Sequence, residues 1–113
     1  MTESKTKTYN EAVMSDEEVV QQVIAGEKGQ FELLMRRYNQ TMYRVIKGYL
    51  TAEDEVEDAM QDAYVNAYRK LSNFRGDAAF STWLIRIGIN EALKRLRKQK
   101  NNIKIDDFEP ERY

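Results

Sequence analysis

The spacing of the apolar residues is the feature that most constrains how this chain can fold. From residue 31 to residue 71 they recur every three or four positions, which is the repeat of one helix face and not the alternation of a strand. The only proline is Pro110, so no proline interrupts a helix before it. Two long helices are predicted, one over residues 28–50 and one opening at residues 51–54. Their apolar positions are Phe31, Leu34, Met35, Tyr38, Met42, Val45, Ile46 and Tyr49, and then Val56, Ala59, Met60, Ala63, Tyr64, Ala67, Tyr68 and Leu71.

Two further helices flank this pair. Ser15 and Glu18 form the pattern of a capping box in front of a short apolar run. A fourth helix is predicted from near Ala79 to about Lys100, and six of its side chains can pack inward: Trp83, Leu84, Ile87, Ile89, Leu93 and Leu96. Short connections without a strand pattern predict an all-α fold, a compact bundle of about four helices. The expected divisions are a flexible lead at 1–14, one helical domain at 15–100, and an extended linker or tail at 101–113.

The residue types that are missing limit the chemistry. The chain has no cysteine and no histidine, which removes thiol nucleophiles, disulfides, histidine bases and the usual zinc ligands. No catalytic residue, metal site or cofactor is therefore predicted, and the chain is not expected to be an enzyme. No apolar run resembles a signal peptide or reaches the length of a membrane span, so membrane insertion is not expected. The lack of cysteine is compatible with a cytoplasmic location.

The charges are segregated along the chain. The formal net charge of −1 by itself argues against a nucleic-acid-binding protein. Residues 53–62, however, hold six acidic side chains and no basic one, whereas residues 86–100 hold six basic side chains and one acidic one. Two patches of opposite sign indicate two different partners.

The acidic patch extends beyond what a helix start requires. Acids at Glu53 to Glu55 favour the helix dipole and solubility, but the dipole effect fades after the first turn. Asp58 and Asp62 lie one turn apart beside Gln61, and no cation is near them in sequence. This pattern favours a docking face for the basic side chains of a partner.

The basic patch follows a turn and an aromatic helix start. Gly76 permits a positive φ, and Asp77 can bond to nearby backbone or cap the next helix. Aromatic side chains stack on bases and cations hold phosphates, so this order is typical of a surface that holds a nucleic-acid strand. Trp83 is expected to anchor the core, whereas Phe80 suits either the core or a base. The alternative for Lys94 and Arg97 is that they only solubilise the helix end and favour its dipole.

Two segments together carry a family resemblance. The first is Val-Glu-Asp-Ala-Met-Gln-Asp-Ala-Tyr-Val-Asn-Ala-Tyr at residues 56–68. The second, at residues 71–87, holds Phe-Arg-Gly and then a Thr-Trp-Leu helix start. In this order and at this separation they resemble region 2 of bacterial sigma factors of the extracytoplasmic-function (ECF) group. The resemblance covers about residues 15–100.

The resemblance implies a division of labour between the two patches. In the family, the third helix docks on the clamp helices of the RNA polymerase β′ subunit, and the matching positions here are Asp58, Gln61, Asp62 and Asn66. The loop and fourth helix recognise the −10 promoter element as it melts, with one nontemplate-strand base flipped into a pocket made by the loop. The matching positions are Arg75, Asp77, Ala78, Phe80, Arg86, Asn90, Lys94 and Arg97. An anti-sigma factor is a further implied partner, and residues 101–113 would lead toward a missing region 4 that reads the −35 element.

Two other functions remain open from the sequence. One is a sigma mimic that sequesters an anti-sigma factor without binding DNA, although such a protein has no need of the retained cations. The other is a small enzyme or cofactor-binding bundle, although the acids lie off the apolar stripes. Binding to single-stranded promoter DNA would separate the leading hypothesis from the mimic.

Overall fold

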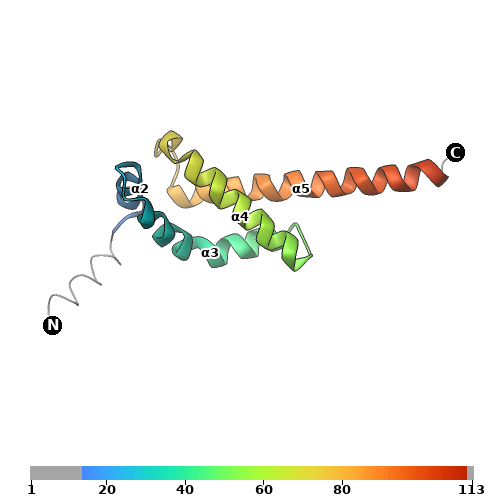
Figure 1. The fold of residues 1–113 in the computed structure, drawn as a ribbon, viewed down its shortest axis with the longest axis horizontal. Helices are drawn as coiled ribbons and strands as arrows, with labels where there is room; N and C mark the ends of the chain where they lie inside the picture. The colour runs from blue at the N-terminus through green and yellow to red at the C-terminus, as the bar shows by residue number, and fades with distance from the viewer. Residues whose placement is uncertain (1–13, 112–113) are drawn as a thin grey trace.

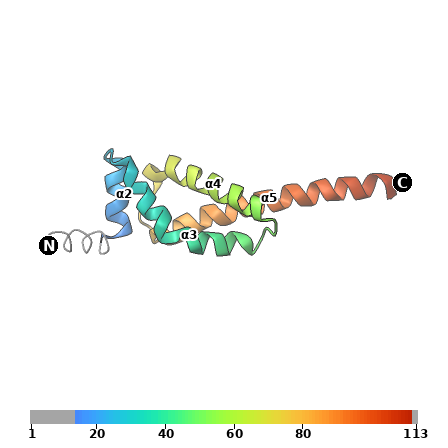
Figure 2. The ribbon, with the colours of Figure 1, turned by 60° about the horizontal axis from the view of Figure 1, so that its bottom comes forward.

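The computed structural model describes residues 14–111, with side chains for residues 14–101. It contains α2 (Asp16–Ile24), the 3₁₀ turn η1 (Lys28–Gln30), α3 (Phe31–Lys47), α4 (Glu53–Arg69), the 3₁₀ turn η2 (Leu71–Asn73) and α5 (Phe80–Glu111). No strand occurs in this described part, and the four α-helices confirm the predicted all-α class (Figures 1 and 2). The lead predicted at residues 1–14 lies outside the described residues except for its last one.

The first helix, α2, is capped and tied to α3. The Ser15 hydroxyl accepts a hydrogen bond from the Glu18 amide at 3.1 Å, and the Glu18 carboxylate accepts one from the Ser15 amide at 2.9 Å. This completes the predicted capping box. The Asp16 carboxylate then accepts hydrogen bonds from Arg37 at 2.6 Å and from the Tyr38 hydroxyl. These bonds hold α2 across the start of the bundle.

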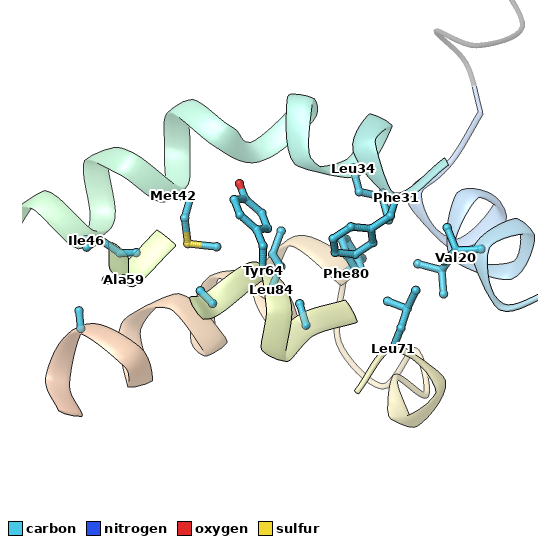
Figure 3. Close-up of a cluster of buried hydrophobic side chains, with 14 of the residues drawn as sticks. Val20, Phe31, Leu34, Met42, Ile46, Ala59, Tyr64, Leu71, Phe80 and Leu84 are labelled. Carbon is cyan, nitrogen blue, oxygen red and sulfur yellow. The ribbon is translucent and has the colours of Figure 1, made fainter. Parts of the chain in front are cut away.

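The core lies between α3, α4 and α5, with α2 closing one end (Figure 3). Most of the predicted apolar stripe of α3 and α4 is buried there, including Leu34, Met42, Ile46, Val56 and Ala63. Tyr49 and Tyr68 are exceptions, because their side chains are exposed. Since α3 ends at Lys47, Tyr49 no longer follows the helical register, and Leu50 is buried instead.

The close approach of α3 and α5 depends on a small residue. A Cβ atom added at Gly88 would lie 2.3 Å from the Met42 sulfur, so no larger residue fits without movement. Gly88 and Ala92 are buried on the core side of α5, whereas Ile87, Ile89 and Leu93 are only half-buried. The predicted apolar stripe of α5 is therefore only partly inside, because small residues form its central contact.

The fourth helix is longer than predicted. It continues without interruption to Glu111 and projects beyond the bundle, as Figures 1 and 2 show. The expected end near Lys100 and the extended conformation expected for residues 101–111 are therefore wrong. Neither glycine nor proline occurs between Gly88 and Pro110, and the asparagines at 101 and 102 are weak helix formers rather than helix breakers. None of the described helices combines the length and apolar character needed to cross a membrane.

Candidate functional site

The loop at residues 74–79 joins η2 to α5 and is held at both ends. Gly76 has φ of +82°, a left-handed conformation that glycine adopts without strain. Phe74, the first residue of the loop, packs edge to face on Phe80, the first residue of α5, with ring centroids 5.5 Å apart. Most of the side chains between them are exposed, and Ala78 is half-buried. The ends of the loop are thus fixed to the bundle while its middle faces outward.

Phe80 belongs to the core and not to the exposed surface. Its side chain is 1% exposed, and its ring contacts those of Phe74, Trp83 and Tyr38. The prediction that Phe80 contacts DNA directly does not fit this conformation. Phe80 lies one turn before the buried Leu84 on the same side of α5, which explains its burial. Trp83 packs on Phe74 and Phe80 at centroid distances of 5.4 and 5.6 Å, with part of its surface still accessible.

The outer face of α5 carries the other predicted DNA-binding side chains. Arg86, Asn90, Lys94 and Arg97 are all exposed. At 3.6 residues per turn they fall within an arc of roughly 80°, on the side of α5 opposite its buried residues. Among the described residues, neither Arg86 nor Arg97 has an ion-pair partner, and the same holds for Arg75 in the loop. The Lys94 ammonium lies 3.5 Å from a Glu91 carboxylate oxygen. This face therefore presents mostly uncompensated positive charge.

A recess of about 480 Å³ between α3 and α5 adjoins this face. Its lining combines hydroxyl groups, aliphatic side chains and one cation: Tyr38, Thr41, Ser81, Thr82, Ile85, Arg86 and Ile89. Burial and the hydrogen bond to Asp16 raise the pKa of Tyr38 to about 12, so its phenol is neutral at physiological pH. Thr41, Ser81 and Thr82 were not predicted from the sequence to belong to a site. The sequence feature that could have indicated this recess is the pair of hydroxyl side chains, Ser81 and Thr82, directly before Trp83.

The predicted docking residues lie on the outside of α4. Asp58, Gln61 and Asp62 are exposed, and Asn66 is half-buried. Asp62, however, is not free of cations as its sequence neighbours suggested, because it forms an ion pair with Arg95 of α5. The sequence does not reveal this contact, because Arg95 follows Asp62 by 33 residues and reaches it only through the packing of α5 on α4.

Arg95 is itself anchored by a buried acid. Its Nε atom donates a hydrogen bond to Glu91 at 3.1 Å, and the Glu91 side chain is only 4% exposed. Burial by itself lowers the pKa of Arg95, but the hydrogen bonds to Asp62 and Glu91 outweigh it and raise that pKa above its ordinary value. Arg95 thus remains charged and joins the two helices.

Other acids of the same run also have partners within the chain. The Glu53 carboxylate accepts hydrogen bonds from the Lys47 ammonium at 2.9 Å and from the Tyr43 hydroxyl at 2.6 Å. Both bonds lower the pKa of Glu53, and the bond from Lys47 has the larger effect. Glu55 accepts a hydrogen bond from the Gln99 amide. Asp58, by contrast, has neither an ion pair nor a side-chain hydrogen bond within the described residues.

An apolar groove of about 610 Å³ lies beside Gln61, between α3 and α4. Its lining is Phe31, Met35, Asn39, Glu57, Met60, Gln61, Tyr64, Val65, Tyr68 and Arg69. Val65 and Tyr68 are 47% and 39% exposed, which makes them two of the large apolar side chains at the surface. This groove was not predicted from the sequence. The sequence feature that could have indicated the groove is Val65, an apolar residue of α4 outside the core stripe.

Comparison with known families assigns the helical domain to one group of proteins. The family model described as Sigma-70 region 2 matches residues 34–102, a segment that includes α4, the loop and most of α5. The chain belongs to the sigma-70 region 2 family. The family is one of transcription initiation factors and not of enzymes.

Curated relatives place this sigma region 2 in the ECF group. It is 40% identical over 79 residues to the ECF RNA polymerase sigma-E factor of Escherichia coli K12, covering 70% of this chain and 41% of that protein. It is 38% identical over 86 residues to ECF RNA polymerase sigma factor SigM of Mycobacterium tuberculosis, covering 76% and 44%. The RNA polymerase sigma-H factor of Pseudomonas aeruginosa is 42% identical over 81 residues, covering 72% and 42%. The chain thus spans less than half the length of these relatives.

A solved structure has the same arrangement of helices. It is the NMR structure of an engineered region 2 of sigmaE in complex with GTAAAA. The two structures superpose with a TM-score of 0.73 at 33% sequence identity, over 80% of this chain and 95% of the other. This confirms the fold of a sigma region 2 domain.

Proposed function

We propose that the chain recognises the −10 promoter element through its nontemplate strand, using the loop at 74–79 and the outer face of α5. The observation that carries the proposal is the cationic face itself. Arg86, Asn90, Lys94 and Arg97 share one side of the helix, directly after a loop that is fixed at both ends. The related sigmaE domain, solved in complex with GTAAAA, supports a short oligonucleotide as the ligand.

The helix start favours a single strand over a duplex. Duplex sequence is read at base edges in the grooves, usually by polar side chains. The first turns of α5 instead hold Phe80, Trp83 and Leu84, which pack on the bundle. The loop, with Asp77 and Ala78, is the proposed wall for one flipped base. Extruding a base costs a few kcal/mol, so contacts between that base and the loop must return a comparable free energy.

We further propose that the outer surface of α4 docks on the clamp helices of the polymerase β′ subunit. Asp58, Gln61, Asp62 and Asn66 are the proposed contacts. The apolar groove beside Gln61 supports the assignment, because exposed Val65, with Glu57 at the same groove, suits a partner helix with apolar and basic side chains. Binding by an anti-sigma factor and action in the cytoplasm belong to the same proposal.

The DNA proposal is tested with the full chain and three forms of one sequence. The probes are the single strand GTAAAA, its complement and the duplex of the two, each measured at several salt concentrations. A set of single strands varied at one base from GTAAAA accompanies them. The expected result is a preference for the nontemplate-type single strand, with affinity that depends on at least one base. Equal affinity for all probes would mean that the domain holds DNA only as a polyanion.

The docking proposal has its own measurement. Asp58→Arg should weaken binding of a β′ clamp-helix fragment, while the far-ultraviolet circular dichroism remains that of the parent. Glu17→Arg on α2, away from α4, replaces an exposed acid outside the capping box; it is the matched control and should bind as the parent does. A chain that binds an anti-sigma factor but none of the DNA probes would instead be a sigma mimic.

A further inference from the structure

The ion pair between Asp62 and Arg95 joins the proposed docking surface to the neighbouring helix. Asp62 lies on α4, and Arg95 lies on the side of α5 that faces α4. It is the one ion pair that links these two helices within residues 14–101. A polar cleft of about 490 Å³ surrounds it, lined by Glu55, Asp62, Glu91, Lys94, Arg95, Lys98 and Gln99.

The two acids that hold Arg95 differ in their exposure. The Glu91 side chain is 4% exposed, whereas the Asp62 side chain is 55% exposed. Withdrawing Arg95 from Glu91 would leave a buried carboxylate with only the longer Lys94 contact, which is strongly unfavourable. Releasing Asp62 into water costs little, because exposed ion pairs contribute little. Arg95 is therefore fixed to Glu91, and Asp62 is the partner that exchanges.

From this asymmetry we infer that Arg95 sets the affinity of the α4 surface by competing with basic side chains of the partner for Asp62. The inference rests on the proposed docking of α4 on RNA polymerase. A partner cation that approaches Asp62 must displace the guanidinium group or lie close to a like charge that cannot move away. Either event reduces the gain from the new contact.

Asp58 provides the internal contrast. It lies one turn before Asp62 on the same helix and has no partner within the described residues. The docking surface thus offers one acid that is open to a partner cation and one that is restrained. A purely basic partner surface offers Arg95 no new acceptor when Asp62 is taken from it, so its binding is weakened more. A partner surface that also presents an acceptor for Arg95 is weakened less.

The test measures the affinity of the full chain for a β′ clamp-helix fragment. Arg95→Gln should bind about two- to fivefold more tightly than the parent, the range expected for losing an exposed competing ion pair. Lys98→Gln is the matched control. It removes the same charge from the same helix and cleft, but Lys98 forms no ion pair within residues 14–101. Its effect should be smaller.

Two further variants make the result specific. Arg95→Gln leaves Glu91 buried and poorly paired, so the double variant Glu91→Gln/Arg95→Gln repeats the measurement without that charge. In an Asp62→Asn background, the gain from Arg95→Gln should disappear, because the competition no longer exists.

The outcomes separate the two proposals. If the folded parent binds the clamp fragment but neither form of the Arg95 variant binds more tightly than Lys98→Gln, the inference is wrong and the docking proposal stands. A gain that persists without Asp62 also overturns it. If the folded parent does not bind the fragment, the docking proposal fails and the inference fails with it.

Discussion

The acidic surface of α4 and the basic surface of α5 each hold six like charges in sequence but differ in how many of them have partners within the chain. On α4, Glu53, Glu55 and Asp62 all have partners in other parts of the chain. On the loop and the outer face of α5, Arg75, Arg86 and Arg97 have no ion-pair partner among the described residues. The fold pairs two of the six acids of residues 53–62 with cations, at Glu53 and Asp62, whereas the three arginines of the other surface are left for an anion from outside.

The difference shows that a run of like charges is not necessarily a free surface. The acids of α4 lie beside α3 and α5, so cations from both helices reach them. Arg95 faces α4 and pairs with Asp62, whereas the outer cations of α5 point away from the bundle, and Glu91 is the one described acid that forms an ion pair with any of them. A polyanion therefore meets little internal competition on the outer face of α5. A basic partner of α4 finds Asp58 open but must displace the contact that Asp62 already makes.

The largest expected effect concerns the support beneath the basic surface. Phe80→Ala should lower the free energy of unfolding by about 3–5 kcal/mol, because it deletes a fully buried aromatic ring. Trp83→Ala should cost less, because the indole is only half-buried. Denaturant unfolding of both variants measures the difference. A Phe80→Ala chain that melts like the parent but loses DNA binding would place Phe80 back in the DNA contact.

A moderate effect is expected on the salt dependence of single-strand binding, which should change when Arg97 of α5 is replaced but not when Arg44 of α3 is replaced. If Arg97 contacts a phosphate, Arg97→Gln should reduce the log–log salt slope of single-strand binding by about 0.7, uniformly across sequences. Arg44→Gln on α3 removes the same charge from an exposed site outside the proposed surface and serves as the control. Equal slopes for the two variants would mean that Arg97 only solubilises the helix.

A smaller effect compares the paired and unpaired acids of α4. Asp62→Asn should cost about 0.2–1 kcal/mol of stability, the usual contribution of an exposed ion pair. Asp58→Asn should leave stability unchanged or raise it slightly, because Asp58 faces other acids and has no cation partner. Thermal or denaturant unfolding of the two variants checks the order. The reverse order would contradict the pairing of Asp62 with Arg95.

The smallest effect is a pH dependence. Because Lys47 and Tyr43 lower the pKa of Glu53, its contribution to stability is present above the ordinary carboxyl value of 4.5 and is lost as the pH falls through the folded value. The melting temperatures of the parent and Glu53→Gln should therefore differ at neutral pH and converge in acid. A difference that is constant with pH would show that Glu53 acts only through packing.

Local patterns predicted the helices well, because each depends on neighbours in sequence. The capping box at Ser15 and the buried stripes of α3 and α4 follow from spacing alone. The end of α5 was predicted too early: residues 101 and 102 are asparagines, which are weak helix formers, but no glycine or proline lies between Gly88 and Pro110 to end the helix there. The sequence could not show the partner of Asp62, since Arg95 is 33 residues away and only helix packing joins them. Nor could it decide the position of Phe80, which depends on how the loop turns.

The most direct test is a pair of amide chemical-shift maps of the full chain, one recorded with the GTAAAA strand and one with the β′ clamp-helix fragment. The division of the molecule into two surfaces predicts two separate footprints. The oligonucleotide should shift residues 74–79 and the exposed positions between Arg86 and Arg97, and the clamp fragment should shift the outer residues of α4 from Asp58 to Tyr68. Shifts from both ligands on the same residues would contradict that division, as would an oligonucleotide footprint on α4.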